Sequence, residues 1–291
     1  LSAANPDDTI GIPLRYYAAH TGRFGGSDKL NFQNMPRGSE LRKCLIAPKD
    51  HLIYVADLSN IEARMLAWLA DQHDLLDQFS NGEDVYSSFA STIYDRPINK
   101  DTDPTERFVG KTAVLGLGYG MGWRKFQATL ALGAAGPVVE VNDEKAWQVV
   151  NAYRSKFYKI PALWNTCDMF LIDMLQGRSN YHKVLETKRN RIELPNGMSL
   201  YYEDLTRSTE GFQFKSNRQT VYTYGGKVTE NVVQALSRIV VTDALLRLAH
   251  KRKDLDVCLT VHDEIVCIGP AEDADERMQD IIDIMCMAPT S

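Results

Sequence analysis

The protein has 291 residues, of which 44% are hydrophobic and 24% charged, and its formal net charge is -5 at pH 7. No segment approaches the roughly 18 consecutive apolar residues of a membrane-spanning helix, so we expect no membrane partner. The net charge argues against nucleic acid covering the whole surface, although local patches can still bind phosphate. Five scattered cysteines favour neither a disulfide framework nor a structural zinc site and fit a reducing cytosol. Because the chain begins with Leu1 and shows no signal peptide, we expect a cytoplasmic fragment of a longer protein.

The first third of the chain predicts loops, then one strand and one helix. Residues 1–50 are rich in Gly, Asn and Pro and show poor periodicity, which predicts loops and short strands. Residues 52–57 (LIYVAD) predict a strand. Ser59 and Glu62 then form a capping-box pattern, which predicts the start of a helix.

The middle of the chain predicts a helical subdomain, with apolar residues at helical spacing. Asp103 is a predicted cap, followed by Pro104 at the first helical position and by Glu106. The expected helices span residues 85–94, 105–120, 123–132, 143–157 and 161–176.

After Gly177 the pattern changes toward strands. Residues 191–194 and 198–202 predict a hairpin around Pro195, Asn196 and Gly197. A helix over residues 229–250 is expected next. Two short strands, 255–261 and 265–268, then flank His262-Asp263-Glu264, and a final helix is expected to end near residue 287.

Asp57 and Asp263 each lie at the polar end of an apolar strand. If these strands are neighbours in one antiparallel sheet, their carboxylates can converge and hold a pair of divalent cations, with Glu264 as a possible third ligand. The alternative, equally compatible with the spacing, is that each is a turn residue or a helix cap.

Arg107, Lys111, Leu115 and Tyr119 recur every four residues and are expected on one helix face. Two cations on that face can bind a polyphosphate, while the Tyr119 ring offers a flat surface to a base. The alternative is a solvated helix end with one buried Tyr. Glycines at several positions of this segment argue against it, because a glycine inside a helix costs about 1 kcal/mol relative to Ala and implies close backbone approach.

These segments together resemble the polymerase core of family A DNA polymerases, the DNA polymerase I group. The resemblance rests on DLSNIEARMLAWLA from Asp57, RFVGKTAVLGLGYGMG from Arg107, VHDEIV from Val261 and TGRFGGSDKLNFQNMPRG from Thr21. A further segment, YGGKVTENVVQALSR from Tyr224, is closer to phage-encoded members. The resemblance implies an α+β right-hand fold with an antiparallel palm sheet and helical fingers: palm over residues 1–75, fingers over 76–185 and palm again over 186–291.

The resemblance also implies the roles of individual residues. Asp57 and Asp263, with the Leu58 carbonyl oxygen, are expected to bind two Mg²⁺ ions that clamp the attacking and leaving oxygens at the α-phosphate. Arg107 and Lys111 are expected to bind the triphosphate. Lys111 is also the expected proton donor to pyrophosphate, since Arg is effectively never deprotonated.

Other residues are expected to contact the nucleotide sugar or the DNA. Glu62 is the expected steric gate against a ribose 2′-hydroxyl, and Tyr119 is expected where the template base enters the site. The expected DNA contacts, along the minor groove of primer-template DNA, are Arg23, Gln33, Asn34 and His262, with Glu264 nearby. The predicted function is thus magnesium-dependent addition of deoxynucleoside triphosphates to a primer.

The sequence departs from the family pattern at Leu115, where the family usually carries Phe or Tyr beside the incoming sugar. No thumb or exonuclease domain is recognised, and the final palm strand is expected to be missing. Two alternatives remain: the core of a single-subunit RNA polymerase, which Glu62 and Glu264 disfavour, and a non-catalytic nucleic-acid-binding fragment.

Overall fold

The computed structural model describes residues 5–27, 31–35, 40–133, 136–216 and 218–289. The chain forms a mixed α+β fold that divides into two compact units. Unit 1 combines Leu1–Ile61 with Gln234–Ser291, and unit 2 is Glu62–Val233. These boundaries differ from the predicted ones at residues 75 and 185, and the division into palm and fingers stays a prediction.

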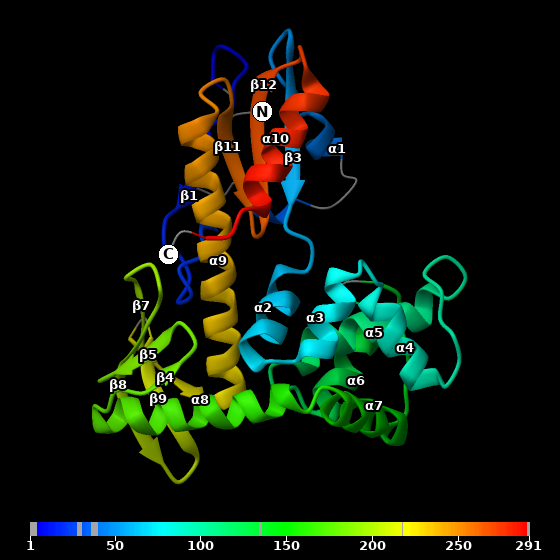
Figure 1. The fold of residues 1–291 in the computed structure, drawn as a ribbon, viewed down its shortest axis with the longest axis vertical. Coiled ribbons are helices and arrows are strands. Elements are labelled where there is room, and N and C mark those ends of the chain that lie inside the picture. Colours follow the sequence, from blue (N-terminus) through cyan, green and yellow to red (C-terminus); the bar gives the residue numbers. More distant parts are fainter. Residues whose placement is uncertain (1–4, 28–30, 36–39, 134–135, 217, 290–291) are drawn as a thin grey trace. The chain divides into compact units, whose positions relative to one another are not determined.

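Unit 1 contains a three-stranded antiparallel sheet in the order β11-β12-β3. Its strands are β3 (His51–Asp57), β11 (Asp256–Val261) and β12 (Glu264–Pro270), so the predicted strands are confirmed. Helix α10 (Ala274–Cys286) follows the sheet, ending one residue before the position that the sequence predicts (Figure 1). Helix α9 (Gly225–Lys251) extends four residues before its predicted start.

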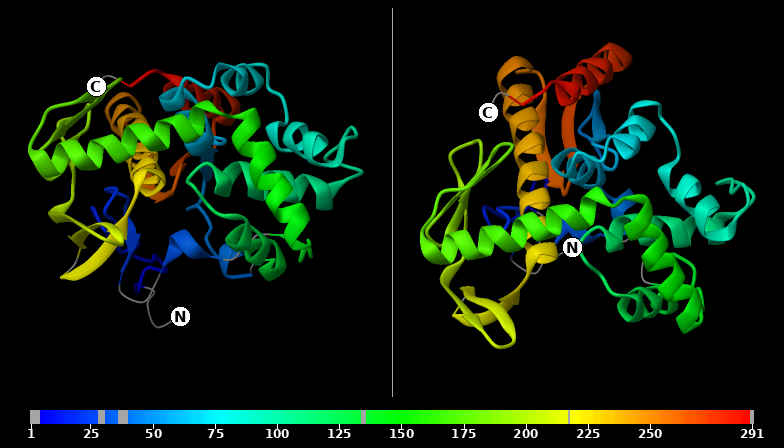
Figure 2. Two further views of the ribbon diagram at one scale, coloured as in Figure 1. Left: turned by 90° about the horizontal axis from the view of Figure 1, so that it is seen from below. Right: turned by 60° about the horizontal axis from the view of Figure 1, so that its bottom comes forward.

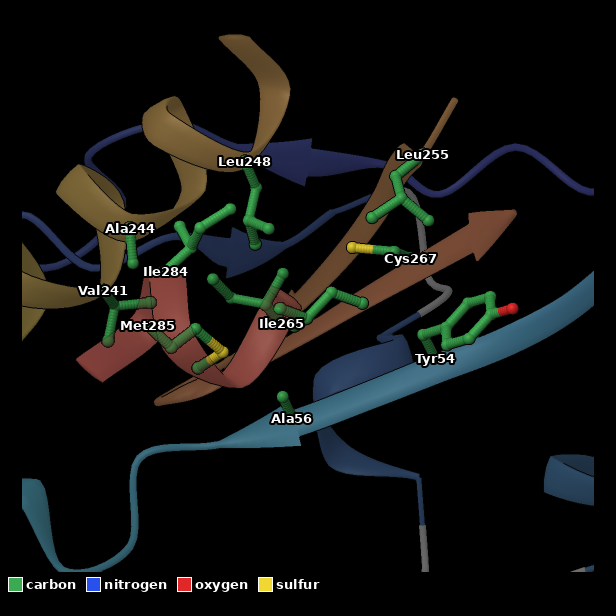
Figure 3. Packing of buried hydrophobic residues seen from close by; sticks show 11 residues of the cluster. Tyr54, Ala56, Val241, Ala244, Leu248, Leu255, Ile265, Cys267, Ile284 and Met285 are labelled. Atoms are coloured by element: carbon green, nitrogen blue, oxygen red, sulfur yellow. The ribbon is translucent and has the colours of Figure 1, made fainter. Parts of the chain in front are cut away.

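The core of unit 1 lies between one face of this sheet and the helices α9 and α10 (Figure 3). Tyr54 and Ala56 point into this core. Ile53, which precedes Tyr54, and Val55, which lies between the two, are exposed. Residues two apart on a strand share a face, so this alternation sets which face of β3 the core covers. Each fully buried aliphatic side chain contributes roughly 1.5–3 kcal/mol, which fixes the register of the sheet.

The N-terminal part of unit 1 consists of loops and short elements, as predicted. Strand β1 (Leu14–Arg15) pairs antiparallel with β2 (Gly25–Gly26). The 3-10 helix η1 (Phe32–Asn34) and the short helix α1 (Glu40–Lys43) follow. The segment from Thr21 that carries part of the family resemblance lies partly outside the described residues.

The first part of unit 2 is helical, as the sequence predicts. Helices α4 (Val85–Tyr94) and α6 (Trp123–Leu132) have the predicted bounds. Helix α3 (His73–Ser80) was not predicted. The remaining helices are α2 (Ile61–Ala70), α5 (Pro104–Leu117), α7 (Asp143–Lys156) and α8 (Lys159–Gln176).

The structure differs from two predicted helix ends, the start of α2 and the end of α5. Helix α2 begins at Ile61, one residue later than a helix capped by Ser59 would begin. Helix α5 ends at Leu117, so Tyr119 lies beyond the helix that was expected to carry it. Asp103 is the cap residue of α5, as predicted, although its side chain makes no cap hydrogen bond. Its carboxylate instead accepts hydrogen bonds from the Asn99 backbone, Thr102 and Arg96, which lower the pKa of Asp103 to about 2.

The second part of unit 2 contains two small antiparallel sheets. The predicted hairpin is confirmed as β6 and β7, in which Ile192 pairs with Leu200. The sheet β8-β9-β10 was not predicted. Helix α8 contacts both sheets and runs past them in both views of Figure 2. The strands are β4 (Tyr181–His182), β5 (Leu185–Lys188), β6 (Arg191–Glu193), β7 (Ser199–Tyr201), β8 (Glu203–Ser208), β9 (Gly211–Ser216) and β10 (Gln219–Thr223). Within the described residues, no helix combines the length and the apolar character needed to cross a bilayer.

Candidate active site

The sheet of unit 1 brings Asp57 and Asp263 to the same end. Strands β3 and β12 pair antiparallel with Glu264 opposite Asp57, and Asp263 directly precedes Glu264. The backbone N–H of Leu58 donates a hydrogen bond to the Asp263 carbonyl oxygen, at 3.1 Å. The Asp57 side chain is exposed and Asp263 is half-buried. The strands are therefore neighbours, which meets the condition set by the sequence analysis, and the two aspartates lie at one end of the sheet.

A two-residue turn holds Asp263 in place. Val261 pairs with Glu264, which leaves His262 and Asp263 as the connection between β11 and β12. His262 adopts a left-handed backbone with φ 56°, a conformation that tight hairpin turns require and that His tolerates better than a branched residue does. The exposed imidazole of His262 and the Asp263 carboxylate are thus presented by a short, geometrically restricted loop.

Glu264 does not form a cluster with the two aspartates. In the described part of the chain, no three His, Cys, Asp or Glu side chains come together in a way that could hold a metal ion. The Glu264 carboxylate instead lies 3.7 Å from the Arg42 guanidinium. The option of Glu264 as a third ligand stays a prediction, and in this structure its carboxylate lies near Arg42.

Three of the predicted DNA-contacting residues line one pocket in unit 1, namely Arg23, Gln33 and His262. The Gln33 amide donates a hydrogen bond to the Thr260 carbonyl oxygen, at 2.9 Å, which ties η1 to β11 next to the turn. Asn34 is exposed and is not part of the pocket lining.

Sequence reasoning missed Arg238, which lines the same pocket. Its guanidinium lies over the rings of Tyr16 and Phe24, 5.4 and 5.9 Å from their centroids, and the residue is 8% exposed. In the sequence, Arg238 is a charged residue followed by the apolar run Ile239–Val241 of a predicted helix. Such a position could have drawn attention, because Arg is rarely buried without partners.

In unit 2, Arg107 of α5 is held by residues at the start of α4. Its Nε and Nη2 atoms donate to the two carboxylate oxygens of Asp84, at 2.6 and 3.2 Å. The Ser87 hydroxyl donates to Asp84 as well, at 2.7 Å, and the Arg107 guanidinium lies 5.3 Å from the Tyr86 ring centroid. Burial raises the pKa of Asp84, but the bonds from Arg107 and Ser87 outweigh it, so this pKa lies below its ordinary value.

Lys111 and Leu115 follow Arg107 on successive turns of α5. Lys111 is half-buried and makes no ion pair within the described residues, so its ammonium group is available to an anion. Leu115 is 40% exposed, although it is a large apolar residue. Along α5, Arg107 is thus paired with a carboxylate, Lys111 makes no ion pair within the described residues, and Leu115 is an exposed apolar side chain.

Tyr119 and Glu62 are brought together although they are 57 residues apart. The Tyr119 hydroxyl donates a long hydrogen bond of 3.5 Å to Glu62 Oε2. The Tyr119 carbonyl oxygen accepts one of 3.4 Å from the Tyr224 hydroxyl. Gly120 follows with φ 81°, so the chain turns sharply after the end of α5. Tyr224 is therefore a further residue of this region that sequence reasoning did not identify.

Comparison with known proteins gives a consistent result. The family model described as DNA polymerase family A matches residues 3–290. The DNA polymerase of Bacillus phage SP02 is 29% identical over 91% of the chain, and the thermostable DNA polymerase I of Thermus aquaticus is 27% identical over 89%. The chain covers 48% of the phage protein and 28% of the Thermus protein.

One solved structure has a similar fold. It is the POL domain of Pol1 from M. smegmatis in complex with DNA primer-template and dNTP, with a TM-score of 0.71 and 20% identity. The match covers 98% of this chain and 46% of that one.

Proposed function

Because the chain belongs to DNA polymerase family A, we propose that it catalyses template-directed addition of deoxynucleotides to the 3′ end of a primer. The observation that carries the proposal is the pairing of β3 with β12, which puts Asp57 and Asp263 at one end of a sheet. The proposed partners are primer-template DNA and deoxynucleoside triphosphates. In this proposal residues 1–75 and 186–291 act as the palm, and residues 76–185 supply the fingers.

The donor set in unit 1 fits magnesium. Mg²⁺ prefers oxygen ligands and is usually held by one or two carboxylates, with substrate phosphates and water completing its shell. Asp57 and Asp263 supply two carboxylates. The Leu58 carbonyl oxygen accepts one hydrogen bond, from the Ile61 N–H at 3.1 Å, and keeps a second lone pair. Bound magnesium would stabilise the negative charge on the attacking and leaving oxygens.

The cations of α5 are proposed to bind the triphosphate. The Lys111 ammonium group has no carboxylate partner within the described residues and can meet a phosphate directly. Arg107 uses two of its five N–H groups on Asp84, which leaves its Nη1 edge for a second phosphate oxygen. Lys111 can also give a proton to the departing pyrophosphate, whereas Arg107 stays protonated.

Glu62 is proposed to exclude ribonucleotides. Its carboxylate is held by the Tyr119 hydroxyl, which restricts the side chain to one region of the site. A carboxylate fixed in the space of a 2′-hydroxyl disfavours the ribose form through steric overlap. Tyr119 in turn is proposed to contact the nascent base pair.

The pocket of unit 1 is proposed to face the DNA minor groove. Arg23, Gln33 and His262 carry N–H groups that can donate to the N3 and O2 acceptors present on every base pair. Such contacts sense the shape of a pair without reading its sequence, which a copying enzyme requires. Asn34 remains a candidate for a neighbouring contact.

Primer extension tests the proposal. A labelled primer-template is incubated with magnesium and either deoxy- or ribonucleotides, using the native chain, Asp263→Ala and Asp256→Asn. Asp256 lies at the opposite end of the same hairpin from Asp263 and serves as the matched control. We expect extension with deoxynucleotides only, a loss of at least about a thousandfold in Asp263→Ala, and near-native rates in Asp256→Asn.

Two results would contradict the proposal. Equal extension by Asp263→Ala would exclude this carboxylate from catalysis, and equal use of ribonucleotides would favour an RNA polymerase. If the native chain does not extend the primer, magnesium-dependent binding of the correct next nucleotide decides the question. Absence of such binding would identify a non-catalytic fragment.

A further inference from the structure

An open pocket in unit 2 shares only Tyr224 with the site described above. Helix α8 lines one side of it, and the sheet β8-β9-β10 with the residue that follows it lines the other. Its residues combine exposed aromatic rings with a few polar groups; those used below are Asp168, Arg207, Phe212, Tyr222, Thr223 and Tyr224.

Two tyrosine rings of this pocket are fixed at their hydroxyl ends and exposed elsewhere. The Tyr222 hydroxyl donates to Glu210 Oε2 at 2.9 Å, and the Tyr224 hydroxyl donates to the Tyr119 carbonyl oxygen at 3.4 Å. The two residues are nevertheless 55% and 51% exposed. Gly226 leaves room for the second ring, because a Cβ atom there would lie 2.8 Å from Tyr224 Cε2. Rings held in this way can receive a flat ligand with little loss of side-chain entropy.

Thr223, between these tyrosines, supplies an unused polar group. The residue is 4% exposed, and its Oγ1 atom makes no hydrogen bond within the described part of the chain. A buried hydroxyl without a partner is destabilising, so its presence in a pocket lining points to a ligand that supplies the missing bond.

The charges of the pocket favour a base over a phosphate. Asp168 contributes a carboxylate whose Oδ1 accepts a bond from the Gly225 N–H at 2.5 Å, and Glu210 contributes a second carboxylate. Both would repel a phosphate inside the pocket. The exposed Arg207 guanidinium lies 5.3 Å from the Phe212 ring centroid and can instead attract a phosphate at the rim. A nucleobase, which is flat, uncharged and polar along its edge, meets these requirements.

We propose that this pocket binds an unpaired base of the single-stranded template. The assignment rests on the proposed polymerase function, in which Tyr119 contacts the templating position. Tyr224, which lines the pocket, bonds directly to the backbone of Tyr119, so the pocket and that position are linked by one residue inside unit 2. The exposed rings stack the base, and the Thr223 hydroxyl pairs with its edge.

Strand binding tests the proposal without requiring extension. Fluorescence anisotropy measures the affinity for a labelled duplex with a template overhang and for the same duplex with blunt ends. Tyr222→Ala is compared with Tyr181→Ala, whose ring is also exposed and whose hydroxyl also bonds to a carboxylate, that of Glu186. We expect Tyr222→Ala to lose about fivefold or more of its affinity for the overhang substrate only, and Tyr181→Ala to lose none. Equal behaviour of the two variants would overturn the proposal.

Thr223→Val provides an independent readout. Replacing an unpaired buried hydroxyl by a methyl group should raise the melting temperature while the overhang affinity falls. An unchanged affinity would refute the role of this hydroxyl. Millimolar deoxynucleoside monophosphate should not displace the strand; displacement would identify a pocket for free nucleotides and overturn the template assignment.

Photocross-linking locates the base. With 5-iododeoxyuridine in the overhang, trypsin should release the cross-link on the peptide of residues 219–227, which contains both tyrosines. A cross-link found only on other peptides would contradict the assignment. A failure of the polymerase proposal appears only in the extension assay, since these measurements contain no nucleotide incorporation.

Discussion

Arg107 and Asp84 form a bidentate ion pair, in which the carboxylate accepts hydrogen bonds from Nε and Nη2 of the guanidinium. The Ser87 hydroxyl donates a further hydrogen bond to the same carboxylate. Asp84 therefore determines which edge of Arg107 remains available, and it lies directly before α4, whereas Arg107 belongs to α5. If Arg107 binds the triphosphate, Asp84 is a positioning residue for that contact.

Replacing Asp84 by Asn should weaken nucleotide binding. The amide keeps the size of the side chain but loses its charge, so that Arg107 is oriented less strictly. We expect KM for the deoxynucleotide to rise about tenfold, with kcat changed less than about threefold. Single-nucleotide incorporation at varied nucleotide concentration measures both constants.

Asp71 offers a matched control for this variant. It pairs with Lys183 at 2.6 Å, and Lys183 in turn lies 4.8 Å from the Trp68 ring centroid, which repeats the arrangement of acid, cation and ring. Asp71→Asn should leave KM unchanged. A decrease of KM in Asp84→Asn would show that Asp84 competes with the triphosphate and does not orient Arg107.

In unit 2 the sequence predicts where the helices lie, but it does not predict which residues of different helices contact each other. The bounds of α4 and α6 follow from local periodicity and from the residues that end them, such as Gly133 with φ 58°. Arg107 and Asp84 are 23 positions apart, and a contact over that separation produces no periodic pattern in the sequence. The same applies to the bond between Tyr119 and Glu62, which only the folded chain reveals.

The small sheet β8-β9-β10 was missed for a different reason. Strand β8 is polar and buries only Leu205, so it lacks the alternation by which a half-buried strand is recognised. Its pairing with β9 contains a register shift between Glu203 and Thr206, which further weakens the pattern. In contrast, β3 and β12 were predictable because each is a short apolar run bounded by an acidic residue, Asp57 at the end of β3 and Glu264 at the start of β12.

Removing the Glu62 side chain should relax the selection of deoxynucleotides. Glu62→Ala leaves a space where a 2′-hydroxyl can fit, so we expect the ratio of ribonucleotide to deoxynucleotide kcat/KM to rise at least about tenfold. Incorporation assays with matched nucleotide pairs measure this ratio. Glu106→Ala is the control, because Glu106 pairs with Arg96 at the start of α5 and should leave the ratio unchanged. An unaltered ratio in Glu62→Ala would exclude the gate.

Introducing a ring at Leu115 should change how the sugar is held. Leu115 is 40% exposed, so Leu115→Phe should fold with a stability change below about 1 kcal/mol. A ring at this position can pack against the incoming sugar, and we expect faster incorporation or at least about threefold altered discrimination against dideoxynucleotides. Rates for paired deoxy- and dideoxynucleotides measure both effects. If neither rate changes, the departure from the family pattern at this position has no consequence for the sugar.

Two glycines of α5 should respond in opposite ways to substitution by Ala. A Cβ atom at Gly110 would lie 2.3 Å from the Tyr86 carbonyl oxygen, in the backbone of α4, so the two helices would have to separate. At Gly116 the nearest atom is Met121 Cε at 3.0 Å, the end of a flexible side chain that can move away. We expect Gly110→Ala to destabilise the protein by about 2 kcal/mol or more. Gly116→Ala should be neutral or stabilising by up to about 1 kcal/mol, since Ala favours helix over Gly.

Urea unfolding monitored by circular dichroism measures both changes, with equal slopes required for the comparison. Because Tyr86 also lies beside the Arg107 guanidinium, Gly110→Ala should raise KM for the nucleotide as well. A stable Gly110→Ala variant would mean that α4 and α5 do not pack at this distance in solution. The orientation of Arg107 would then need a different explanation, because Asp84, which accepts a bond from Ser87, contacts Arg107 from the start of α4.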